Sequence, residues 1–439
     1  MGDPDLLIVG AGAAGIAAAR EARSLGLDVR VLEARGRVGG RAHTVQDLGS
    51  PFDLGATWLH AAQSNPLVPL AEARGLELFN HDLVRSGRTW TDGHWATAEE
   101  LAEYDAAEHA WHEALMLAPD TPGLSLADAA PRGGRWDATL LHWEGPVICG
   151  AEPEAMDLAD WRATMLNGSN LLPREGCGHL LEVLAEGLPI TLDAPVTRLS
   201  WGGRRVRAEG PFGAVEAGAA IVTVSTGVLA SGAIAFDPPL PVATQEAAHD
   251  LPMGLLIKFG LRAAGEDRLD LPAFGGLERR LEPGERAMTW ISWPFGRAYL
   301  SGFAGGALAW DLSAAGDAAT LDHAFSELRD MFGARADRAL RRDGAAVASW
   351  GRDPWARGAY SYARPGGSAA RAALSVPLGG GRLRLAGEAC HTSLAATLAG
   401  AWYSGAAAAR EAAATLGRSP RVTERTGYTG RVPAPSSGG

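Results

Sequence analysis

The hydrophobic pattern at the start of the chain predicts a strand, a helix and a second strand. The apolar run at residues 5–9 is typical of a buried parallel strand, and the alanine-rich stretch at 13–25 is typical of a helix that ends before Gly26. Residues 29–32 form the next apolar run. This order predicts a βαβ unit and places the chain in the α/β class.

Further along the chain the pattern indicates two alternating regions. Strand-like runs occur at 190–199, 219–224, 255–261 and 382–386, helical ones at 318–331 and from the loop after 386 to Leu416. Residues 61–165 carry His, Trp and acidic residues at helical spacing, with proline breaks, which predicts an inserted second domain. We expect a discontinuous nucleotide-binding domain (1–60, 166–245 and 345–416), a mixed α/β substrate domain (61–165 and 246–344) and a disordered tail (417–439).

Composition and charge narrow the choice of partner. The 439 residues are 46% hydrophobic and 21% charged, as in soluble globular proteins. Residues 61–165 hold 18 Asp and Glu against 6 Arg, whereas the rest of the chain is nearly neutral. A nucleic-acid surface needs the opposite sign. The acidic segment either attracts cations or is a solvated face, and the sequence leaves both interpretations open.

The cysteines and the longest apolar runs bear on location. Three widely spaced cysteines fit neither a disulfide framework nor a zinc site, and the histidines of the acidic segment show no HExxH spacing, so we expect a cytoplasmic protein without a metal. The run at 6–19 lacks the basic flank of a signal peptide, because Asp3 and Asp5 precede it. The run at 394–409 is short for a membrane span, so we expect no membrane segment.

A glycine motif lies at the turn of the βαβ unit. Gly10, Gly12 and Gly15 form GxGxxG between the first strand and the first helix, and Glu33 ends the second strand. Glycines let the backbone approach a pyrophosphate at the helix N-terminus, where amide donors favour anions. Glu33 can accept hydrogen bonds from ribose hydroxyls. The motif therefore predicts a Rossmann-type dinucleotide site.

A second glycine loop favours FAD over NAD. Arg35, Arg37 and Arg41 flank Gly39 and Gly40, and three guanidinium groups suit the clamping of an embedded pyrophosphate. No second GxGxxG follows in a strand–turn–helix context, so a built-in site for a pyridine nucleotide is not expected. An oxidase with a diffusing acceptor such as oxygen fits the sequence better than a reductase.

Several blocks resemble the flavin-containing amine oxidases. They are residues 33–41 (EARGRVGGR), 53–60 (DLGATWLH), 238–241 (PPLP), 350–362 (WGRDPWARGAYSY), 386–388 (AGE) and 396–400 (ATLAG). Within that family the chain is most similar to polyamine oxidases and lysine-specific histone demethylases. The resemblance implies the amine oxidase fold, a Rossmann-type FAD-binding domain with an inserted substrate domain.

The resemblance also implies the cofactor contacts. Beside Gly10, Gly12, Gly15 and Gly40, they are Ala14, Glu33, Arg35, Arg41, Thr57, Trp58, Val196, Glu388, Thr397 and Leu398. Thr397 lies near the start of the last helix, whose positive end can stabilise charge on the reduced isoalloxazine. Ala359 and Tyr360 stand near the place of the cysteine that bonds the flavin in monoamine oxidases. The FAD is therefore expected to be noncovalent.

Lys258 is the only lysine among the 40 basic residues. It lies in an apolar strand, so its ammonium group is expected to point into a pocket or an interface. Lysine, unlike arginine, lowers its pKa readily when desolvated and can hold a water. The alternative is a lysine that snorkels from an edge strand. The resemblance assigns it the family's lysine, which reaches flavin N5 through a water.

The substrate amine is expected to meet aromatic side chains. By resemblance, Trp355 and Tyr362 lie beside the flavin, whereas Thr397 takes the place of the second tyrosine of monoamine oxidases. This favours a longer, more linear amine. His60 matches a histidine near the substrate amine in animal polyamine oxidases, although a lone histidine is as often structural.

These observations predict an FAD-dependent amine oxidase. A hydride would pass from the carbon beside a neutral primary or secondary amine, a polyamine or a related amine, to the flavin, and oxygen would be reduced to hydrogen peroxide while the imine hydrolyses to an aldehyde. The expected partners are a small cationic amine and oxygen, with no nucleic acid and no membrane, in a monomer or homodimer. An L-amino-acid oxidase remains the main alternative, followed by a flavin desaturase and a non-catalytic flavin-binding protein.

Overall fold

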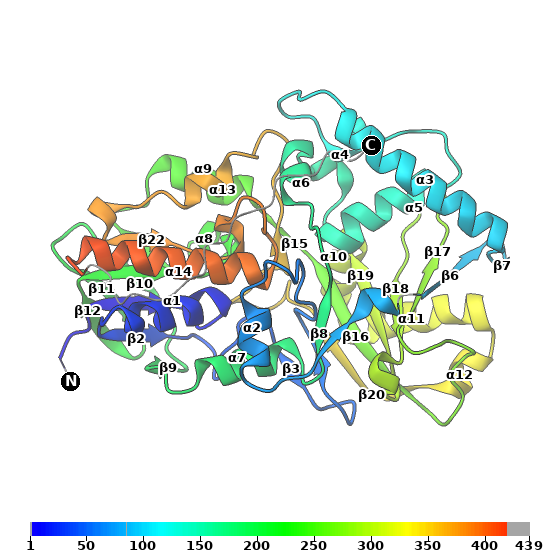
Figure 1. Ribbon diagram of the computed structural model, residues 1–439, viewed down its shortest axis with the longest axis horizontal. Helices are drawn as coiled ribbons and strands as arrows, with labels where there is room; N and C mark the ends of the chain where they lie inside the picture. The colour runs from blue at the N-terminus through cyan, green and yellow to red at the C-terminus, as the bar shows by residue number, and fades with distance from the viewer. Residues whose placement is uncertain (1, 85, 419–439) are drawn as a thin grey trace, which may run out of the picture.

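The computed structural model describes residues 2–84 and 86–418 (Figure 1). Most of the tail expected at 417–439 lies outside the described residues, which end at 418. In Figure 1 the N-terminal sheet with α1 and α14 lies on the left, and the helices and strands of the acidic segment lie on the right. Within the described ranges, no helix is both long enough and apolar enough to span a membrane.

The βαβ unit is confirmed at the centre of a five-stranded parallel sheet. Strand β1 (Leu6–Val9), helix α1 (Ala13–Ser24) and strand β2 (Val29–Leu32) follow the predicted order, and β1 pairs with β2 in parallel. The sheet has the order β22-β13-β1-β2-β9, in which the other strands are β9 (Ile190–Thr191), β13 (Ala219–Val222) and β22 (Leu383–Leu385).

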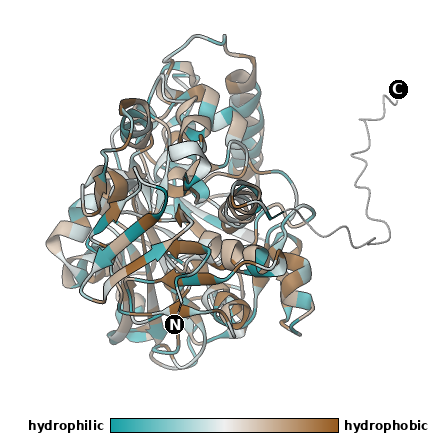
Figure 2. Ribbon diagram, turned by 90° about the vertical axis from the view of Figure 1, so that its left-hand side faces the viewer, coloured by the Kyte–Doolittle hydropathy of each residue, from teal (hydrophilic) through white to brown (hydrophobic). Residues whose placement is uncertain are grey.

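Alternate residues of β1 serve two different cores. Leu6 and Ile8 pack against the alanines of α1 and α14 (Leu398–Thr415). Leu7 and Val9 face a four-stranded sheet, which comprises β10 (Arg198–Ser200), β11 (Val206–Gly210), β12 (Gly213–Ala217) and β14 (Ala235–Asp237). A Cβ on Gly405 of α14 would lie 2.0 Å from the Ala14 carbonyl oxygen, so only glycine permits this helix contact. In Figure 2 the helices carry both brown and teal segments, as helices with one buried face do.

The single strand expected at 190–199 was wrong. Its first residues form β9 in the parallel sheet and its last residues form β10 in the four-stranded sheet. Between them Asp193 has a φ of 52° and Pro195 follows, so the chain turns from one sheet to the other. The backbone N–H of Ala194 donates to the carbonyl oxygen of Glu33 at 2.8 Å, which holds this turn against the end of β2.

A seven-stranded mixed sheet forms the second half of the fold, in the order β20-β16-β19-β18-β17-β6-β7. Its strands are β6 (Ser86–Thr91), β7 (His94–Trp95), β16 (Leu256–Ala263), β17 (Gly275–Arg279), β18 (Thr289–Ser292), β19 (Tyr299–Gly305) and β20 (Leu340–Ala348). Ile257, Phe259 and Leu261 pack on helices α10 (Gly306–Ala315) and α11 (Asp317–Phe332). Lys258 lies between them in sequence and therefore on the opposite face of the sheet.

The acidic segment is mainly helical but also supplies β6 and β7 to this sheet. Its helices are α3 (Ala98–Leu117), α4 (Leu126–Ala129), α5 (Asp137–His142), the π-helix η2 (Trp143–Cys149) and α6 (Leu158–Thr164). Thr97 and Glu100 form a capping box at the start of α3. Buried Trp111, Trp136 and Trp161 form the core of this helical layer, so these tryptophans serve packing.

Candidate active site

A large cavity of about 1130 Å³ connects the glycine motif of the parallel sheet to helix α3. Seventeen of the eighteen predicted site residues line it. They are Gly10, Gly12, Ala14, Glu33, Arg35, Gly40, Arg41, Thr57, Trp58, His60, Val196, Lys258, Trp355, Tyr362, Glu388, Thr397 and Leu398. Gly15 does not line it, because this glycine serves packing: a Cβ there would lie 1.9 Å from the Gly10 carbonyl oxygen.

The nucleotide end of the cavity is built from backbone. Gly10 has a φ of 103°, and Gly12 begins α1 without any side-chain cap, so the first amides of the helix remain available to an anion. The second glycine loop lies directly against the first, and a Cβ on Gly40 would approach the Cα of Gly12 to 3.2 Å. This arrangement leaves room for a pyrophosphate at the start of α1.

Glu33 stands at the end of β2 with its carboxylate fixed by two amides. The N–H of Ala11 donates to Oε2 at 2.7 Å and the N–H of Arg35 donates to Oε1 at 2.9 Å. Glu33 is buried, yet each carboxylate oxygen retains a second lone pair that can accept a hydroxyl. The position suits a ribose.

Two of the three loop arginines line the cavity. Arg35 pairs with Asp353 at 2.7 Å and Arg41 pairs with Glu388 at 2.9 Å. Arg37 does not line it, contrary to the expected three-arginine clamp: its Nη1 donates to the Val38 carbonyl, and its guanidinium lies 6.0 Å from the centre of the Trp350 ring. The clamp therefore has two guanidinium groups, both already paired with carboxylates.

Glu388 is the centre of a buried polar network that reaches the helical layer. Its carboxylate accepts from Arg41, from the N–H and hydroxyl of Ser361 at 3.1 and 2.7 Å, and from the N–H of Ala396 at 3.0 Å. Burial alone would raise the pKa of Glu388, but the Arg41 and Arg371 guanidinium groups outweigh it and hold the pKa below its ordinary value. Glu388 is therefore ionised.

The same network continues through Arg371, which is almost fully buried. Arg371 donates to the Ser361 hydroxyl at 2.9 Å and to both carboxylate oxygens of Asp160 at 2.6 and 2.8 Å. Asp160 belongs to α6 of the acidic segment. A chain of hydrogen bonds from Asp160 through Arg371 and the Ser361 hydroxyl to Glu388 thus ties α6 to the cofactor end of the cavity.

The start of α14 faces the cavity with free amides. Thr397 is the N-cap, and its hydroxyl accepts from the N–H of Gly400 at 3.0 Å. Ala396 has a φ of 60° and its N–H is held by Glu388. The positive end of this 18-residue helix therefore points at the cavity, as expected from the sequence.

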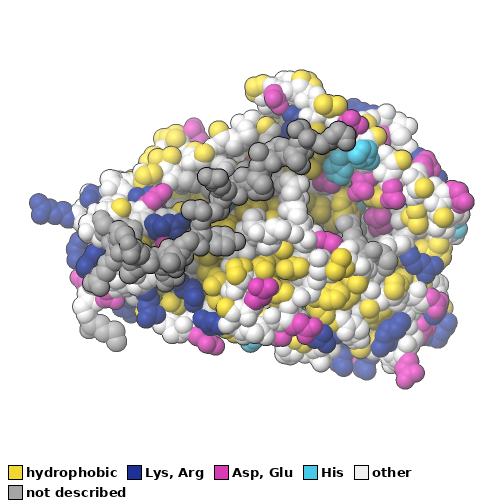
Figure 3. Space-filling model, viewed as in Figure 1, with side chains coloured by type: hydrophobic (Ala, Val, Ile, Leu, Met, Phe, Trp, Pro, Cys, Tyr) yellow, Lys and Arg dark blue, Asp and Glu magenta, His cyan; other side chains and the backbone are white. Residues whose placement is uncertain are grey.

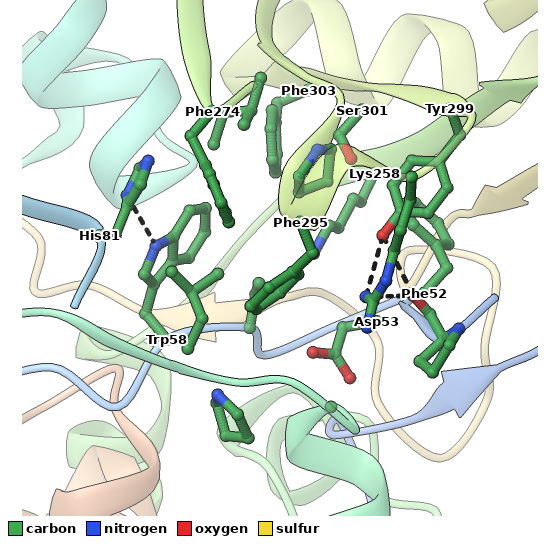
Figure 4. Close-up of a pocket in the computed structure, with 18 residues that line it drawn as sticks. Phe52, Asp53, Trp58, His81, Lys258, Phe274, Phe295, Tyr299, Ser301 and Phe303 are labelled. Carbon is green, nitrogen blue, oxygen red and sulfur yellow. Dashed lines mark hydrogen bonds between the residues drawn. The ribbon is translucent and has the colours of Figure 1, made fainter. Parts of the chain in front are cut away.

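Lys258 projects from an interior strand into the cavity, with only 5% of its surface exposed. β16 pairs with both β19 and β20, so the alternative of a lysine snorkelling from an edge strand is excluded. Nζ hydrogen-bonds the Thr57 hydroxyl and lies 5.4, 5.7 and 5.5 Å from the ring centres of Phe52, Trp58 and Phe303 (Figure 4). Desolvation lowers the pKa of Lys258 to about 8.

The buried carboxylate of Asp53 opposes the effect of desolvation on the pKa of Lys258, because its negative charge stabilises the ammonium group. Its carboxylate accepts from the Thr44 hydroxyl at 2.5 Å and from the N–H groups of Cys177 and Gly178 at the start of helix α7 (Cys177–Ala185). Burial raises the pKa of Asp53, whereas the charge of Lys258 lowers it. The two charges therefore stabilise each other in a site from which water is largely excluded.

His60 lies on the opposite wall from the nucleotide end. Its Nδ1 is 2.6 Å from Oδ1 of Asn170, and its ring stacks at 6.0 Å on Trp58. Burial lowers the pKa of His60. A neutral imidazole therefore faces the cavity, with its orientation set by Asn170.

Trp355 and Tyr362 reach the cavity from the loop around β21 (Tyr360–Ser361). Tyr362 is half-buried, and burial raises the pKa of its hydroxyl, which stays protonated. Trp355 is 37% exposed, more than expected of a ring that holds a substrate. Tyr360 also lines the cavity and was not among the predicted site residues.

Helix α3 presents one face to the far end of the cavity. Leu101, Tyr104, Asp105, Glu108 and His112 line it at helical spacing. Figure 3 shows acidic and histidine side chains together beside a hollow at the upper right of the molecule. Nε2 of His112 donates to the Glu144 carboxylate at 2.9 Å, and this carboxylate raises the pKa of His112. Among the described residues, Asp105 and Glu108 form no ion pair, and no group of His, Cys, Asp and Glu could hold a metal ion.

The site residues that the sequence did not predict act through distant partners. Asp160, Asn170 and Arg371 lie outside the recognised blocks, and Ser361 lies inside one but carries no motif of its own. In the folded chain Asn170 contacts His60 and Ser361 contacts Glu388, whereas Arg371 and Asp160 are hydrogen-bonded to Glu388 only through Ser361. Asp53 had a local signal, because it opens the block that contains Thr57 and Trp58.

The cavity fits the dinucleotide and isoalloxazine parts of FAD. Uncapped amides at the start of α1, a carboxylate at the end of β2, paired arginines and the free amides of α14 occur in one continuous cavity. Amides at a helix start and arginines bind a pyrophosphate, and a carboxylate accepts hydrogen bonds from a ribose. The amides at the start of α14 suit an electron-rich ring.

Several known proteins have sequences similar to this chain. The chain is 29% identical over 452 residues to polyamine oxidase 4 of Oryza sativa subsp. japonica, which covers 93% of this chain and 88% of that relative. It is 29% identical over 436 residues to lysine-specific histone demethylase 1 homolog 2 of the same organism, over 91% of this chain but 56% of that relative.

The fold has a solved counterpart in cyclohexylamine oxidase from Brevibacterium oxydans IH-35A. The TM-score is 0.75 at 22% identity, covering 95% of this chain and all of that one. The profile of the family described as flavin containing amine oxidoreductase matches residues 13–141 and 152–413, which is most of the chain. The chain therefore belongs to the flavin-containing amine oxidoreductases, and its cofactor is FAD.

Proposed function

We propose that the protein is an oxidase that removes a hydride from the carbon next to a primary or secondary amine of a polyamine or a related linear amine. Oxygen is the acceptor, and the products are an imine, which water hydrolyses to an aldehyde, and hydrogen peroxide. The observation that carries this proposal is one cavity lined by the predicted nucleotide site, by the single lysine of the chain, which is buried, and by Asp105 and Glu108, which form no ion pair with the described residues. The similarity to polyamine oxidases supports it.

The cofactor contacts follow from the placement of the predicted residues. The glycines Gly10, Gly12 and Gly40 and the amide of Ala14 would accommodate the pyrophosphate, Glu33 would bind the ribose, and Val196 would contact the same cofactor. Arg35, Arg41, Thr57, Trp58, Glu388, Thr397 and Leu398 surround the rest of the group. When bound, FAD supplies the two-electron chemistry. It is held without a covalent bond, because Ala359 and Tyr360 offer no thiol at that place.

Lys258 orients a water at the centre of the cavity. Its ammonium group is fixed by the Thr57 hydroxyl and three aromatic rings, so it presents a proton to this water along one direction only. With a pKa of about 8, it can also give up a proton near neutral pH. Arginine could not do this, which accounts for the one lysine in an arginine-rich chain.

The reacting amine must be neutral and held beside aromatic faces. Tyr362 and Trp355 provide these faces, and the neutral His60 accepts or donates a hydrogen bond at the same wall without adding a competing charge. Asp105 and Glu108 attract a distal ammonium group of the same substrate. Distal charge and neutral reacting nitrogen together select a linear polyamine over a monoamine.

The L-amino-acid oxidase alternative needs a free arginine for the substrate carboxylate. Three arginines line the cavity among the described residues, and each is paired: Arg35 with Asp353, Arg41 with Glu388 and Arg371 with Asp160. An incoming carboxylate would have to displace one of these partners. This favours amines over amino acids.

We propose the following division of the chain into two domains. The FAD-binding domain comprises 1–60, 166–245 and 345–416, and the substrate domain comprises 61–165 and 246–344, although β20 crosses the last boundary. A cytoplasmic monomer or homodimer agrees with the three free cysteines of the described chain.

The test is anaerobic mixing of the purified yellow protein with spermidine, spermine, putrescine, tyramine and L-amino acids, while the flavin absorption band is recorded by stopped flow. Rapid bleaching by the polyamines, slower bleaching by tyramine and none by amino acids is the expected result. Bleaching by amino acids alone would establish the alternative. A protein that only dithionite bleaches would refute the amine-oxidase proposal.

A further inference from the structure

A second, smaller cavity of about 40 Å³ lies next to Lys258 (Figure 4). Seven residues, among them Lys258, Trp58 and Phe303, line both this cavity and the large one, so the two adjoin. The rest of the wall consists of aromatic rings and prolines together with Asp53, Leu172, Gly176, Arg297 and Ser301. The volume is sufficient for a few atoms only, since a single water needs roughly 10–15 Å³ by the same measure.

One polar side chain of this cavity has no assigned partner. Ser301 is 5% exposed and lines the small cavity from β19, on the same sheet face as Tyr299 and Phe303. No hydrogen bond from its hydroxyl to any of the described residues occurs. The Ser301 oxygen is not among the fully buried atoms that lack a partner, so it is accessible from the cavity and can bind a water or a ligand there. The cavity therefore has a polar part, to which Ser301, Lys258, Thr57 and the Asp53 carboxylate contribute.

The outer end of the cavity reaches the turn between β18 and β19. Phe295 and Arg297 line the cavity and are half-buried, while Gly296 between them is exposed. Phe295 lies 5.0 Å from Phe274, ring centre to ring centre, and the Arg297 guanidinium lies 4.5 Å over the Phe295 ring. The cavity thus lies between this partly exposed turn and Lys258.

The backbone of this end is strained. Phe274, Trp293 and Phe295 have φ values of 62°, 46° and 58°, a region that bulky residues rarely adopt. Each such residue costs about 1–3 kcal/mol and persists where the surrounding structure requires it. Here the strained residues direct Phe274 and Phe295 toward the cavity rather than into the core.

We propose that this small cavity is the site through which dioxygen approaches Lys258, separate from the cavity that admits the amine. The inference rests on oxygen as the acceptor in the proposed function. A cavity of about 40 Å³ admits a diatomic molecule and is too small for a polyamine. The amine can therefore occupy the large cavity without blocking the oxidant.

The inner end of the cavity matches the electronic demand of the reaction. Dioxygen takes up two electrons from the reduced cofactor and two protons, one from the reduced cofactor and one from solvent, and leaves as hydrogen peroxide while the cofactor returns to its oxidised form. Negative charge develops on oxygen during this transfer. A fixed ammonium group in a water-poor site stabilises it, and the Ser301 hydroxyl donates a hydrogen bond.

Two Ser301 variants of the holoenzyme distinguish the effect of the cavity volume from the effect of the hydroxyl group. Ser301→Leu fills the cavity, whereas Ser301→Ala leaves it open and removes only the hydroxyl. Each enzyme is reduced anaerobically with amine and then mixed with oxygenated buffer, so both half-reactions are measured. We expect the ratio of the oxygen rate to the amine rate to fall at least about tenfold in Ser301→Leu, which is about 1.4 kcal/mol, and by less than about threefold in Ser301→Ala.

Binding is tested independently with xenon, an apolar atom that fits such a cavity. Crystals of the wild-type holoenzyme under xenon pressure should show the atom between Ser301, Phe295 and Lys258, and Ser301→Leu crystals should not. Absence of xenon from the wild-type cavity, or an unchanged rate ratio in Ser301→Leu, would overturn the inference. If oxygen fails to reoxidise the wild type although xenon binds, the proposed acceptor is wrong and the assigned ligand falls with it.

Discussion

The two ends of the large cavity differ in whether their charged side chains are paired. At the nucleotide end, every charged side chain that lines the cavity is fixed by a partner, as Glu33 is by two amides and Arg41 by Glu388. At the α3 end, Asp105 and Glu108 share a helix face without an ion-pair partner among the described residues, and Asp105 is exposed. The same cavity is therefore rigid at one end and open to solvent at the other.

The difference reflects what each end must bind. A cofactor that stays bound gains from preorganised partners, because no ordering cost is left to be met on binding. A cationic substrate that must arrive and leave gains from unpaired surface charge, which raises its local concentration without holding it tightly. Removing a charge should thus reduce cofactor binding and stability strongly at the nucleotide end, and should weaken substrate binding only slightly at the α3 end.

The largest effect is expected at Glu388. Glu388→Ala leaves the Arg41 guanidinium and the Arg371 network without their buried anion, and breaking such a pair costs about 3–5 kcal/mol. We expect a purified protein with little FAD and a lower melting temperature. The ratio of flavin to protein absorbance and a thermal unfolding curve measure both.

The matched control at the same end is Asp353→Asn. Asp353 pairs with Arg35, but its side chain is 23% exposed, so solvent can replace part of the lost interaction. Its flavin content should stay above that of Glu388→Ala. Equal loss in the two variants would contradict the importance of the buried network.

The second effect concerns Lys258, which stands between the two ends. Lys258→Met keeps the side-chain length but removes the ammonium group that contacts Thr57, and either flavin reduction or reoxidation should slow by at least about tenfold, the low end for a removed proton-transfer group. Stopped-flow absorbance resolves the two half-reactions. Unchanged rates in both would refute a catalytic role for Lys258.

The part of the site that sequence predicts is the part that is local. The order β1, α1 and β2 brings Gly10, Gly12 and Glu33 together within one βαβ unit, so the motif alone sufficed. The position of Lys258 in a buried strand was likewise readable from alternation, although its place in an interior strand required the sheet order.

The rest depends on pairings between distant segments. Asp160 and Arg371 are 211 positions apart and His60 and Asn170 are 110 apart, and no periodicity or motif relates such residues. The break of residues 190–199 into β9 and β10 was missed because the two short strands join different sheets, although Pro195 between them is a local signal of such a break. The small cavity behind Lys258 also arises from a turn, residues 293–296, that carries no local signal of a site.

The third effect is a pH dependence. Because burial lowers the pKa of Lys258 to about 8, its ammonium group is nearly complete about one pH unit below that value, half present at it and lost above it. The rate of flavin reoxidation should therefore be constant up to about pH 7 and then decline, falling up to about tenfold for each unit well above pH 8, as the cation titrates. Lys258→Arg, which cannot deprotonate, should lose this fall. A wild-type profile that rises above pH 8 would contradict the sign.

The smallest effect is expected at the α3 end. Asp105→Asn and Glu108→Gln each remove a solvent-accessible charge, and such charges contribute about 0.2–1 kcal/mol, so KM for spermidine should rise by about two- to fivefold in each variant. Added salt should reduce the difference from wild type, because it screens the same attraction. KM for tyramine, which lacks a distal ammonium group, should be unchanged.

Glu113→Gln on the same helix is the control for this last comparison. Glu113 is exposed and does not line the cavity, so it alters the net charge of α3 equally without approaching the substrate. If all three variants raise KM alike, attraction by the whole acidic segment accounts for the effect. If only Asp105→Asn and Glu108→Gln do, these two carboxylates contact the distal ammonium directly, and the open end of the cavity is a binding site as well as a charged surface.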